Sequence, residues 1–144
     1  VLLERPGSTG RAPGVLYVDV DRLGRINNAF GHPAGDQLLT TVASRMRDGL
    51  RVDDLLARFG GDEFVVVLPG VGSREDARLV AEKLRQAVCQ DADVDGHIVV
   101  PAISIGVALA RPGDTVKRLL KRADQALLLA KENGKNRTAD DADL

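Results

Sequence analysis

Arg58-Phe59-Gly60-Gly61-Asp62-Glu63-Phe64 lies between two apolar runs, at residues 55–57 and 64–68. Glycine adopts backbone angles that are strained for other residues, so a two-glycine turn between short apolar runs predicts a β-hairpin over residues 55–68. The turn carries two adjacent carboxylates beside backbone that no side chain covers. Taken alone, this is also the pattern of an ordinary solvated turn. A second acidic strand end upstream favours a binding site instead.

Composition limits the class of protein. The chain has 144 residues, enough for one domain with a single core, and 44% hydrophobic and 28% charged residues are ordinary for a globular fold. Lys and Arg number 20 against 21 Asp and Glu, a formal charge of -1. Overall charge therefore attracts neither nucleic acid nor an anionic membrane, and any phosphate-bearing ligand must be held locally. Three Phe, one Tyr and no Trp offer few rings for base stacking.

The single cysteine, Cys89, excludes an internal disulfide and fits a reducing compartment. No apolar stretch is long enough to cross a bilayer, and no signal peptide is visible. We expect a cytoplasmic location without membrane contact by this segment, although a longer protein could be anchored through other segments. The abrupt start at Val1 is what we expect of a piece of a longer protein.

Strands and helices alternate over residues 14–137. In chain order we expect a buried strand at residues 15–20, helices at residues 22–30 and after a turn at residues 31–35, the hairpin at residues 55–68, a helix capped by Ser73, a polar turn at residues 91–96, a strand at residues 97–110 bent at Pro101, and a last helix from Asp114 or Thr115 to Gly134. This order, βααββαβα, predicts an α+β fold with helices packed on a mixed sheet. Residues 1–13 are expected to be a lead-in left from an upstream linker, and residues 138–144 a disordered acidic tail.

Carboxylates gather at two predicted strand ends, Asp19 and Asp21 on one and Asp62 and Glu63 on the other. If these strands are neighbours, the carboxylates converge at one edge of the sheet. Clustered carboxylates repel unless a cation lies between them, and oxygen-only ligands favour Mg²⁺ or Mn²⁺. Such a cation bridging phosphates is what phosphoryl and nucleotidyl transfer require. Asp21 equally fits a role in orienting Asp19 or the following turn.

Other polar residues suit a nucleotide. Backbone N–H groups at residues 22–24 lie at a helix start, where phosphate oxygens bind well. Asn27 and Asp36 offer the donors and acceptors that a guanine edge needs, although both also suit helix caps or turns. Lys131 and Lys135 are one helical turn apart, which suits phosphate contact from one helix face or complementing the helix dipole.

A series of spaced motifs now carries a resemblance. The motifs are Asp19-x-Asp21, Asn27, Gly31-His32-x-x-Gly35-Asp36, residues 58–64, Ser104-Ile105-Gly106, Ala123-Asp124-Gln125-Ala126, Ala130-Lys131 and Gly134-Lys135-Asn136-Arg137. Over about residues 14–137 the chain resembles the GGDEF family of diguanylate cyclases. Several motifs in the right order are far more specific than one short pattern. The resemblance implies a ferredoxin-like, nucleotidyl-cyclase-palm-type mixed sheet flanked by helices.

The resemblance also implies an activity, the condensation of two GTP molecules into cyclic di-GMP with release of two pyrophosphates. Two Mg²⁺ or Mn²⁺ ions per active site are expected. Asp19, Asp62 and Glu63 would bind them, with the Val20 carbonyl as a further ligand. Asp62 or Glu63 would also favour deprotonation of the attacking 3′-hydroxyl.

For the substrate, the resemblance implies that Asn27, His32 and Asp36 hold the guanine and ribose, while Lys131 and Lys135 bind the β and γ phosphates. His32 also fits a loop histidine that packs on its turn. Further substrate contacts are expected from Arg22, Leu23, Arg58, Gly60 and Gly61. Because each domain holds one GTP, two domains must meet face to face as a homodimer, and upstream sensor or other signalling domains are expected.

Arg51-Val52-Asp53-Asp54 forms an RxxD pattern upstream of the glycine turn. In the family, this pattern binds cyclic di-GMP and causes feedback inhibition, and arginine suits bidentate phosphate binding. Arg51 and Asp54 equally fit an ordinary surface ion pair. Lys83 lies one residue from a position where some members supply a second basic contact.

The chain departs from the family at Gly24, where a lysine usually stabilises the transferring phosphate. Arg22 also replaces an aromatic residue, Asn28 an Asp and Leu128 a Tyr. One missing cation near the α-phosphate can cost roughly 10²–10³ in rate. A second hypothesis is therefore a weak or inactive domain that binds GTP or cyclic di-GMP and regulates a neighbouring domain. A third is another metal-dependent phosphotransferase with the palm fold.

Overall fold

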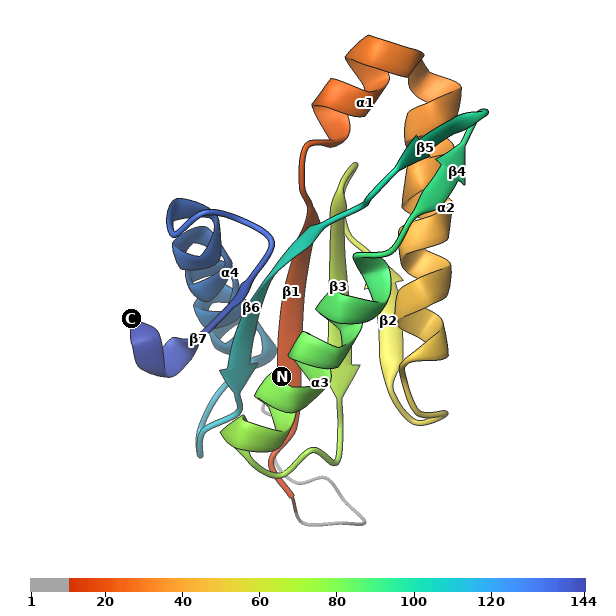
Figure 1. Cartoon of the computed structure of the whole chain (residues 1–144). Helices are drawn as coiled ribbons and strands as arrows, with labels where there is room; N and C mark the ends of the chain where they lie inside the picture. The colour runs from red at the N-terminus through yellow and green to blue at the C-terminus, as the bar shows by residue number, and fades with distance from the viewer. Residues whose placement is uncertain (1–10) are drawn as a thin grey trace.

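The computed structural model describes residues 11–144, so residues 1–10 of the expected lead-in lie outside the described residues. The elements are β1 (Gly14–Val20), α1 (Leu23–Phe30), α2 (His32–Asp48), β2 (Leu55–Arg58), β3 (Glu63–Leu68), α3 (Arg74–Val88), β4 (Ala92–Val94), β5 (His97–Val99), β6 (Ile103–Leu109), α4 (Val116–Glu132), β7 (Thr138–Asp140) and a 3₁₀ turn, η2 (Asp141–Asp143). Figure 1 shows the helices packed around the central sheet. No helix in this part of the chain is long and apolar enough to cross a membrane.

Five strands form the main sheet, in the order β2-β3-β1-β6-β7. β1 is antiparallel to both of its neighbours, β3 and β6, and β7 joins β6 in parallel. Strands β2, β3, β1 and β6, with the helices that connect them, have the split βαβ arrangement of ferredoxin-like folds. The predicted α+β fold, with helices flanking a mixed sheet, is confirmed.

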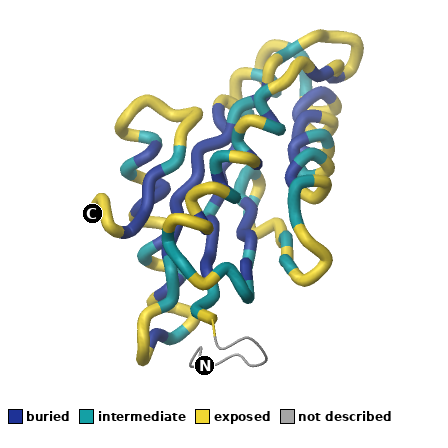
Figure 2. The backbone as a smooth tube through the Cα atoms, turned by 60° about the horizontal axis from the view of Figure 1, so that its bottom comes forward, coloured by how far each residue is buried: buried dark blue, intermediate teal, exposed yellow. Residues whose placement is uncertain are grey.

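Side chains alternate along β1 and so separate the two faces of the sheet. Leu16, Val18 and Val20 are buried in the larger core, which α1, α2 and α3 cover. Val15 and Tyr17 belong to the opposite face, which packs on α4. In Figure 1, α3 crosses in front of the sheet, and Figure 2 shows how much of the central strands is buried. The same alternation directs Asp19 toward α4.

Gly106 in β6 lets α4 lie directly on the sheet. A β-carbon at this position would overlap the helix backbone at Ala123 and Leu127. Glycine inside a strand often marks such a close approach of another backbone. Gly106 pairs with Tyr17 in the register of β6 and β1. This contact therefore sets the position of α4 relative to the acidic end of β1.

The expectation of a disordered tail at residues 138–144 is wrong, because these residues form β7 and η2. Asp141 is buried and lies 2.9 Å from Arg74 of α3 and 3.2 Å from Arg122 of α4. A buried carboxylate needs such partners to offset its lost hydration. The aspartates that suggested disorder therefore attach this segment to two helices.

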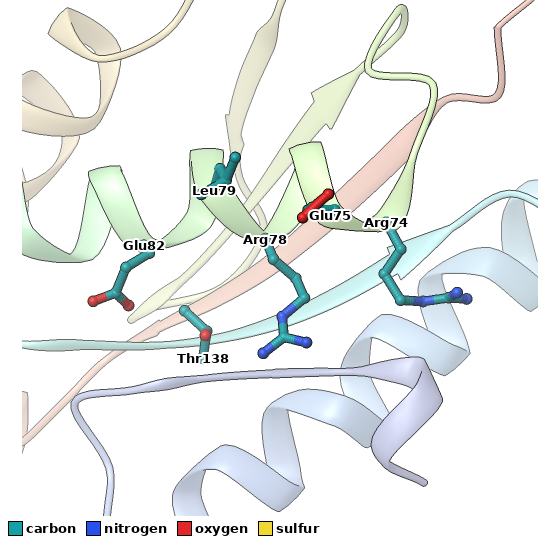
Figure 3. Close-up of a pocket in the computed structure, with 6 residues that line it drawn as sticks. All are labelled: Arg74, Glu75, Arg78, Leu79, Glu82 and Thr138. Carbon is teal, nitrogen blue, oxygen red and sulfur yellow. The ribbon is translucent and has the colours of Figure 1, made fainter.

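A cavity of about 590 Å³ lies between α3 and β7, away from the acidic strand end (Figure 3). It is lined by Arg74, Glu75, Arg78, Leu79, Glu82 and Thr138. Its arginines are already paired, Arg74 with Asp141 at 2.9 Å and Arg78 with Asp140 at 3.3 Å. We therefore interpret the cavity as a structural junction between α3 and the last strand.

Two predicted turns are shorter than expected. In residues 91–96, Ala92–Val94 form β4, and only Asp95 and Gly96, with φ of 53° and 85°, make the turn into β5. In residues 31–35, α2 already begins at His32, with a proline in its first turn, where proline's fixed φ suits a helix. Polar and glycine residues led to the prediction of a turn in both segments, although residues 91–96 form part of a hairpin and residues 31–35 contain the start of α2.

The single strand expected at residues 97–110 is interrupted around Pro101: β5 and β6 lie on either side of this residue and belong to different sheets. Ser73 caps α3 by accepting a hydrogen bond from the N–H of Asp76 at 3.1 Å. Thr115, rather than Asp114, caps α4 by accepting from the N–H of Arg118 at 3.2 Å. These short polar side chains satisfy N–H groups that have no acceptor within the helix.

Candidate functional site

Carboxylates from β1 and from the glycine turn converge, as the sequence predicts. The register of β1 and β3 places Asp19 opposite Glu63. One residue further, the N–H of Val20 donates to the carbonyl oxygen of Asp62 at 2.9 Å. Directly opposite residues of an antiparallel pair lie on the same face of the sheet. Asp19 and Glu63 therefore both lie on the face that α4 covers.

The turn between β2 and β3 is braced by backbone and by Arg58. The N–H groups of Phe59 and Gly60 donate to the Glu63 carbonyl at 2.8 and 3.4 Å. The Arg58 guanidinium donates to the two glycine carbonyls at 3.1 and 2.7 Å. A β-carbon at Gly61 would meet nothing within 4 Å, so the turn leaves open space beside its carboxylates. Arg58 is thus engaged with the turn, and its phosphate contact stays a prediction.

Asp19 is the least satisfied group of the site. It is 6% exposed, and its Oδ2 pairs with Lys131 of α4, while its buried Oδ1 has no hydrogen-bond partner among the described residues. Burial raises the pKa of Asp19 to about 6; the pair with Lys131 lowers it, and the Asp62 carboxylate raises it. Burial lowers the pKa of Lys131, but Asp19, Asp62 and Glu63 outweigh this and raise it.

These oxygens fit a divalent cation. Asp19 Oδ1 is a carboxylate oxygen without a donor, and the Asp62 carboxylate is close enough to shift the Asp19 pKa. Within residues 11–144 no group of three or more His, Cys, Asp or Glu side chains is arranged to hold a metal. Mg²⁺ is commonly bound by one or two carboxylates together with substrate phosphates and water. The pair therefore suits a cation that binds with its substrate.

The residues expected to bind guanine and ribose lie on α1 and α2. The Asn27 amide packs against Gly35, where a β-carbon would overlap it. His32 and Asp36, one turn apart at the start of α2, are both exposed. The missing side chain at Gly35 therefore brings Asn27 next to the first turn of α2. Asp36 and Arg58 also line one cleft of about 380 Å³ between α2 and β2.

The start of α1 follows the acidic end of β1 directly. Arg22 precedes the helix with a left-handed φ of 60°, and Leu23 packs against the larger core. The first N–H groups of a helix have no acceptor inside it, so those of Leu23 and Gly24 are suited to an anion. A β-carbon at Gly24 would meet nothing within 4 Å, so this position has room for a side chain.

The expectation that Lys131 and Lys135 share one helix face is wrong. α4 ends at Glu132, and Gly134 and Lys135 adopt φ of 128° and 63°. The N–H of Gly134 donates to the Lys131 carbonyl at 3.2 Å, and that of Lys135 to the Ala130 carbonyl at 3.1 Å, which is the pattern of a glycine-terminated helix. Lys131 therefore belongs to the helix, and Lys135 to the loop that follows.

Arg51 and Asp54 form a closed turn. The N–H of Arg51 donates to Asp54 Oδ2 at 2.8 Å, and the N–H of Asp54 donates to the Arg51 carbonyl at 3.0 Å. Both residues line a cavity of about 350 Å³, to which Asp53 and Arg11 also contribute. Lys83 is not among the residues that line this cavity. Arg51 and Asp54 of the RxxD pattern thus line a cavity and are not an isolated ion pair on the surface.

Sequence reasoning missed several neighbours of the site. Tyr17 donates to Glu63 Oε1 at 3.4 Å and packs edge-on against Phe59, with ring centroids 6.1 Å apart. Ser104 and Asn136 both donate to Asp21, at 2.8 and 2.9 Å. The alternation of β1 was a signal for Tyr17, which must share a face with Asp19. The contacts of Asp21 depend on residues far away in the sequence, so no local pattern indicated them.

Comparison with known proteins gives one consistent family. The family model described as "Diguanylate cyclase, GGDEF domain" matches residues 2–137. Diguanylate cyclase DosC of Escherichia coli is 37% identical over 131 residues, which cover 90% of this chain and 28% of DosC. The chain spans between 17% and 30% of the length of the curated relatives it matches.

Solved structures agree. The GGDEF domain of PA1120 (TpbB or YfiN) from Pseudomonas aeruginosa has a TM-score of 0.86 and 37% identity, over 90% of this chain and 77% of that one. The GGDEF domain of DgcB from Caulobacter crescentus, solved in complex with c-di-GMP, has a TM-score of 0.87 and 26% identity, over 92% of this chain and 80% of that one.

Replacing Asp19 by Asn is predicted to stabilise the metal-free protein. Because folding raises the pKa of Asp19 from 3.8 to about 6, the folded state binds this proton more tightly, and stability falls as pH rises between these values. In the presence of a chelator, we expect Asp19→Asn to raise Tm by roughly 2–5 °C at pH 7.5 and by much less at pH 5. Thermal unfolding followed by circular dichroism measures this.

Asp114→Asn is the matched control for that experiment. Arg122 lowers the pKa of Asp114, so its charge stabilises the fold and its loss should lower Tm at pH 7.5. A Tm for Asp19→Asn at or below that of the wild type at pH 7.5 would contradict the view that ionised Asp19 is unsatisfied.

Proposed function

The chain belongs to the GGDEF family of diguanylate cyclase domains, and we propose that it condenses two GTP molecules into cyclic di-GMP with release of two pyrophosphates. The observation that carries this proposal is Asp19, whose buried Oδ1 has no partner among the described residues and which interacts with Asp62 and Lys131. A carboxylate pair with one oxygen that no described protein group satisfies, beside a lysine able to meet a phosphate, suits metal-dependent nucleotidyl transfer.

Asp19, Asp62, Glu63 and the Val20 carbonyl would hold two Mg²⁺ or Mn²⁺ ions, which when bound supply neutralisation of the triphosphate charge and a more acidic 3′-hydroxyl. Asp62 or Glu63 favours removal of the proton from that hydroxyl. Lys131, now paired with Asp19, would exchange this partner for the β and γ phosphates when the nucleotide binds. Preorganised charge of this kind is usually the largest contribution to catalysis.

Other residues orient the substrate. Asn27, His32 and Asp36 would hold guanine and ribose, with Asn27 kept at the first turn of α2 by its contact with Gly35. Arg22 and the N–H groups of Leu23 and Gly24 would meet phosphate oxygens at the start of α1. Gly60 and Gly61 leave room for the nucleotide, and Arg58, which donates to both glycine carbonyls, keeps the turn in shape.

Two copies of the domain are required, because each holds one GTP and the product joins both. We propose a homodimer in which the two sites face each other, with its assembly controlled by sensor or other signalling domains of a longer protein. A cytoplasmic location follows from the use of GTP as substrate. We expect neither nucleic acid nor membrane to be bound by this segment.

Purified protein at high concentration should convert GTP to cyclic di-GMP in the presence of Mg²⁺, and Asp62→Ala should reduce the rate at least about 10²-fold, since a positioned catalytic charge is lost. Chromatography of the products measures the rate. Asp48→Ala, which removes an exposed carboxylate at the far end of α2, should leave it unchanged. Equal rates for wild type and Asp62→Ala, or turnover of ATP in preference to GTP, would contradict the proposal.

Gly24 favours a second candidate function, a domain that binds GTP or cyclic di-GMP with little turnover and regulates a neighbouring domain. The usual lysine is absent here, and the position has open space around it. If this loss limits turnover, Gly24→Lys should raise kcat by roughly 10²–10³. Gly24→Gln adds length without charge and should not. An unchanged kcat in Gly24→Lys would count against this candidate, because Arg22 or Arg25 would then already supply the charge.

We further propose that Arg51 and Asp54 bind cyclic di-GMP and mediate product inhibition. Support comes from their position on a cavity of about 350 Å³ that Arg11 also lines. Loss of one bidentate arginine–phosphate contact should weaken binding at least about tenfold in Arg51→Ala. Isothermal calorimetry with cyclic di-GMP measures this, with the exposed Arg118→Ala as the control. Unchanged affinity in Arg51→Ala would exclude this site.

A further inference from the structure

Asp21 is a buried carboxylate that the proposed mechanism does not use. It lies two residues beyond Asp19 and is 8% exposed. Its Oδ1 accepts a hydrogen bond from the Ser104 hydroxyl at 2.8 Å, and its Oδ2 accepts from the backbone N–H of Asn136 at 2.9 Å. Both oxygens are thus already occupied by protein donors, unlike Asp19 Oδ1. This arrangement fits a structural anchor better than a metal ligand.

The segment that Asp21 holds has an unfavourable backbone. Gly134, Lys135 and Asn136 have φ of 128°, 63° and 47°, and for the two residues with side chains the left-handed region is strained. Such conformations persist only where surrounding contacts over-determine them. Asn136 has three further contacts. Its N–H also donates to Ser104 Oγ at 3.2 Å, its Oδ1 accepts from Arg85 Nη1 at 3.0 Å, and its Nδ2 donates to Cys89 Sγ at 3.9 Å.

The end of β1 is therefore connected to both lysines. Asp19 pairs with Lys131 directly. Asp21 reaches Lys135 through the backbone of the adjacent Asn136. Asp19 and Asp21 lie two residues apart at one strand end. A single element therefore sets the positions of Lys131 and Lys135 relative to the carboxylate pair of Asp19 and Asp62.

We propose that Asp21 is a positioning residue, which holds the loop at residues 134–136 in its left-handed conformation so that Lys135 meets the terminal phosphates of the nucleotide. The identity of the ligand, a nucleotide with terminal phosphates, rests on the proposed function. The mechanical link between Asp21 and the loop does not depend on the proposed function. The two parts can therefore be tested separately.

The link is tested by hydrogen exchange of the Asn136 amide in the protein without nucleotide. In Asp21→Ala this amide loses its shorter acceptor, and its exchange should accelerate at least about tenfold. Asp21→Asn keeps an acceptor oxygen and should restore much of the protection. Asp141→Asn is the matched control, since it alters a different buried carboxylate, one that pairs with Arg74 and Arg122, and should not alter this amide. Unchanged exchange in Asp21→Ala overturns the proposal.

The role in binding is tested by calorimetry with a non-hydrolysable GTP analogue and with GMP, both with Mg²⁺. Asp21→Ala should weaken analogue binding roughly tenfold, the effect of one lost charged contact, and leave GMP binding unchanged because GMP has no β or γ phosphate. Lys135→Ala should have the same effect, and the double variant should be no weaker than either single one. Equal losses for GMP and the analogue, or additive losses, overturn the proposal.

The outcomes also separate this proposal from the proposed function. One outcome is that analogue binding weakens in Asp21→Asn as much as in Asp21→Ala and that the affinity for the analogue depends less on Mg²⁺ concentration than in the wild type. This outcome identifies Asp21 as a metal ligand and overturns the positioning role. A wild-type protein that binds neither GMP nor the analogue overturns the proposed function and, with it, the ligand assigned to Lys135. The exchange experiment then still decides whether Asp21 holds the loop.

Discussion

The antiparallel register of β1 and β3 is the constraint on which the site depends. It sets Asp19 opposite Glu63 and ties Val20 to the Asp62 carbonyl, so carboxylates distant in the sequence meet at one edge of the sheet. Pairing in a sheet shifts by whole residues, and a slip of one would turn Asp19 to the opposite face. Leu16 and Val18, buried in the larger core on the other face of β1, prevent that slip. The apolar core thus holds the charged site in place.

The face toward α4 carries the rest of the site. Along β1 this face presents Tyr17 and Asp19, and the absent side chain at Gly106 lets α4 pack close enough for Lys131 to reach Asp19. Burying a carboxylate with one unsatisfied oxygen costs stability, which the raised pKa of Asp19 reflects. Such unsatisfied groups are typical of sites that complete their contacts with a ligand. Stability and function are therefore opposed at this one residue.

Much of the fold could be predicted because its signals are local. Alternation and β-branched residues indicated β1, and the glycine turn with its apolar flanks indicated β2 and β3. The convergence of Asp19 with Asp62 followed once these strands were taken as neighbours. Long-range contacts were out of reach: residues 138–144 read as a polar tail until Arg74 and Arg122 were seen to surround Asp141. Likewise, the left-handed loop that removes Lys135 from α4 depends on Asp21, more than a hundred positions away.

The most direct test of the account is a crystal structure with Mg²⁺ and a non-hydrolysable GTP analogue. We predict a cation between Asp19 and Asp62 that contacts a phosphate oxygen, with Lys131 moved from Asp19 onto the terminal phosphates and Lys135 beside it. A nucleotide bound elsewhere, with Lys131 still paired to Asp19 and no cation at the two carboxylates, would contradict the assignment of this strand end as the active site.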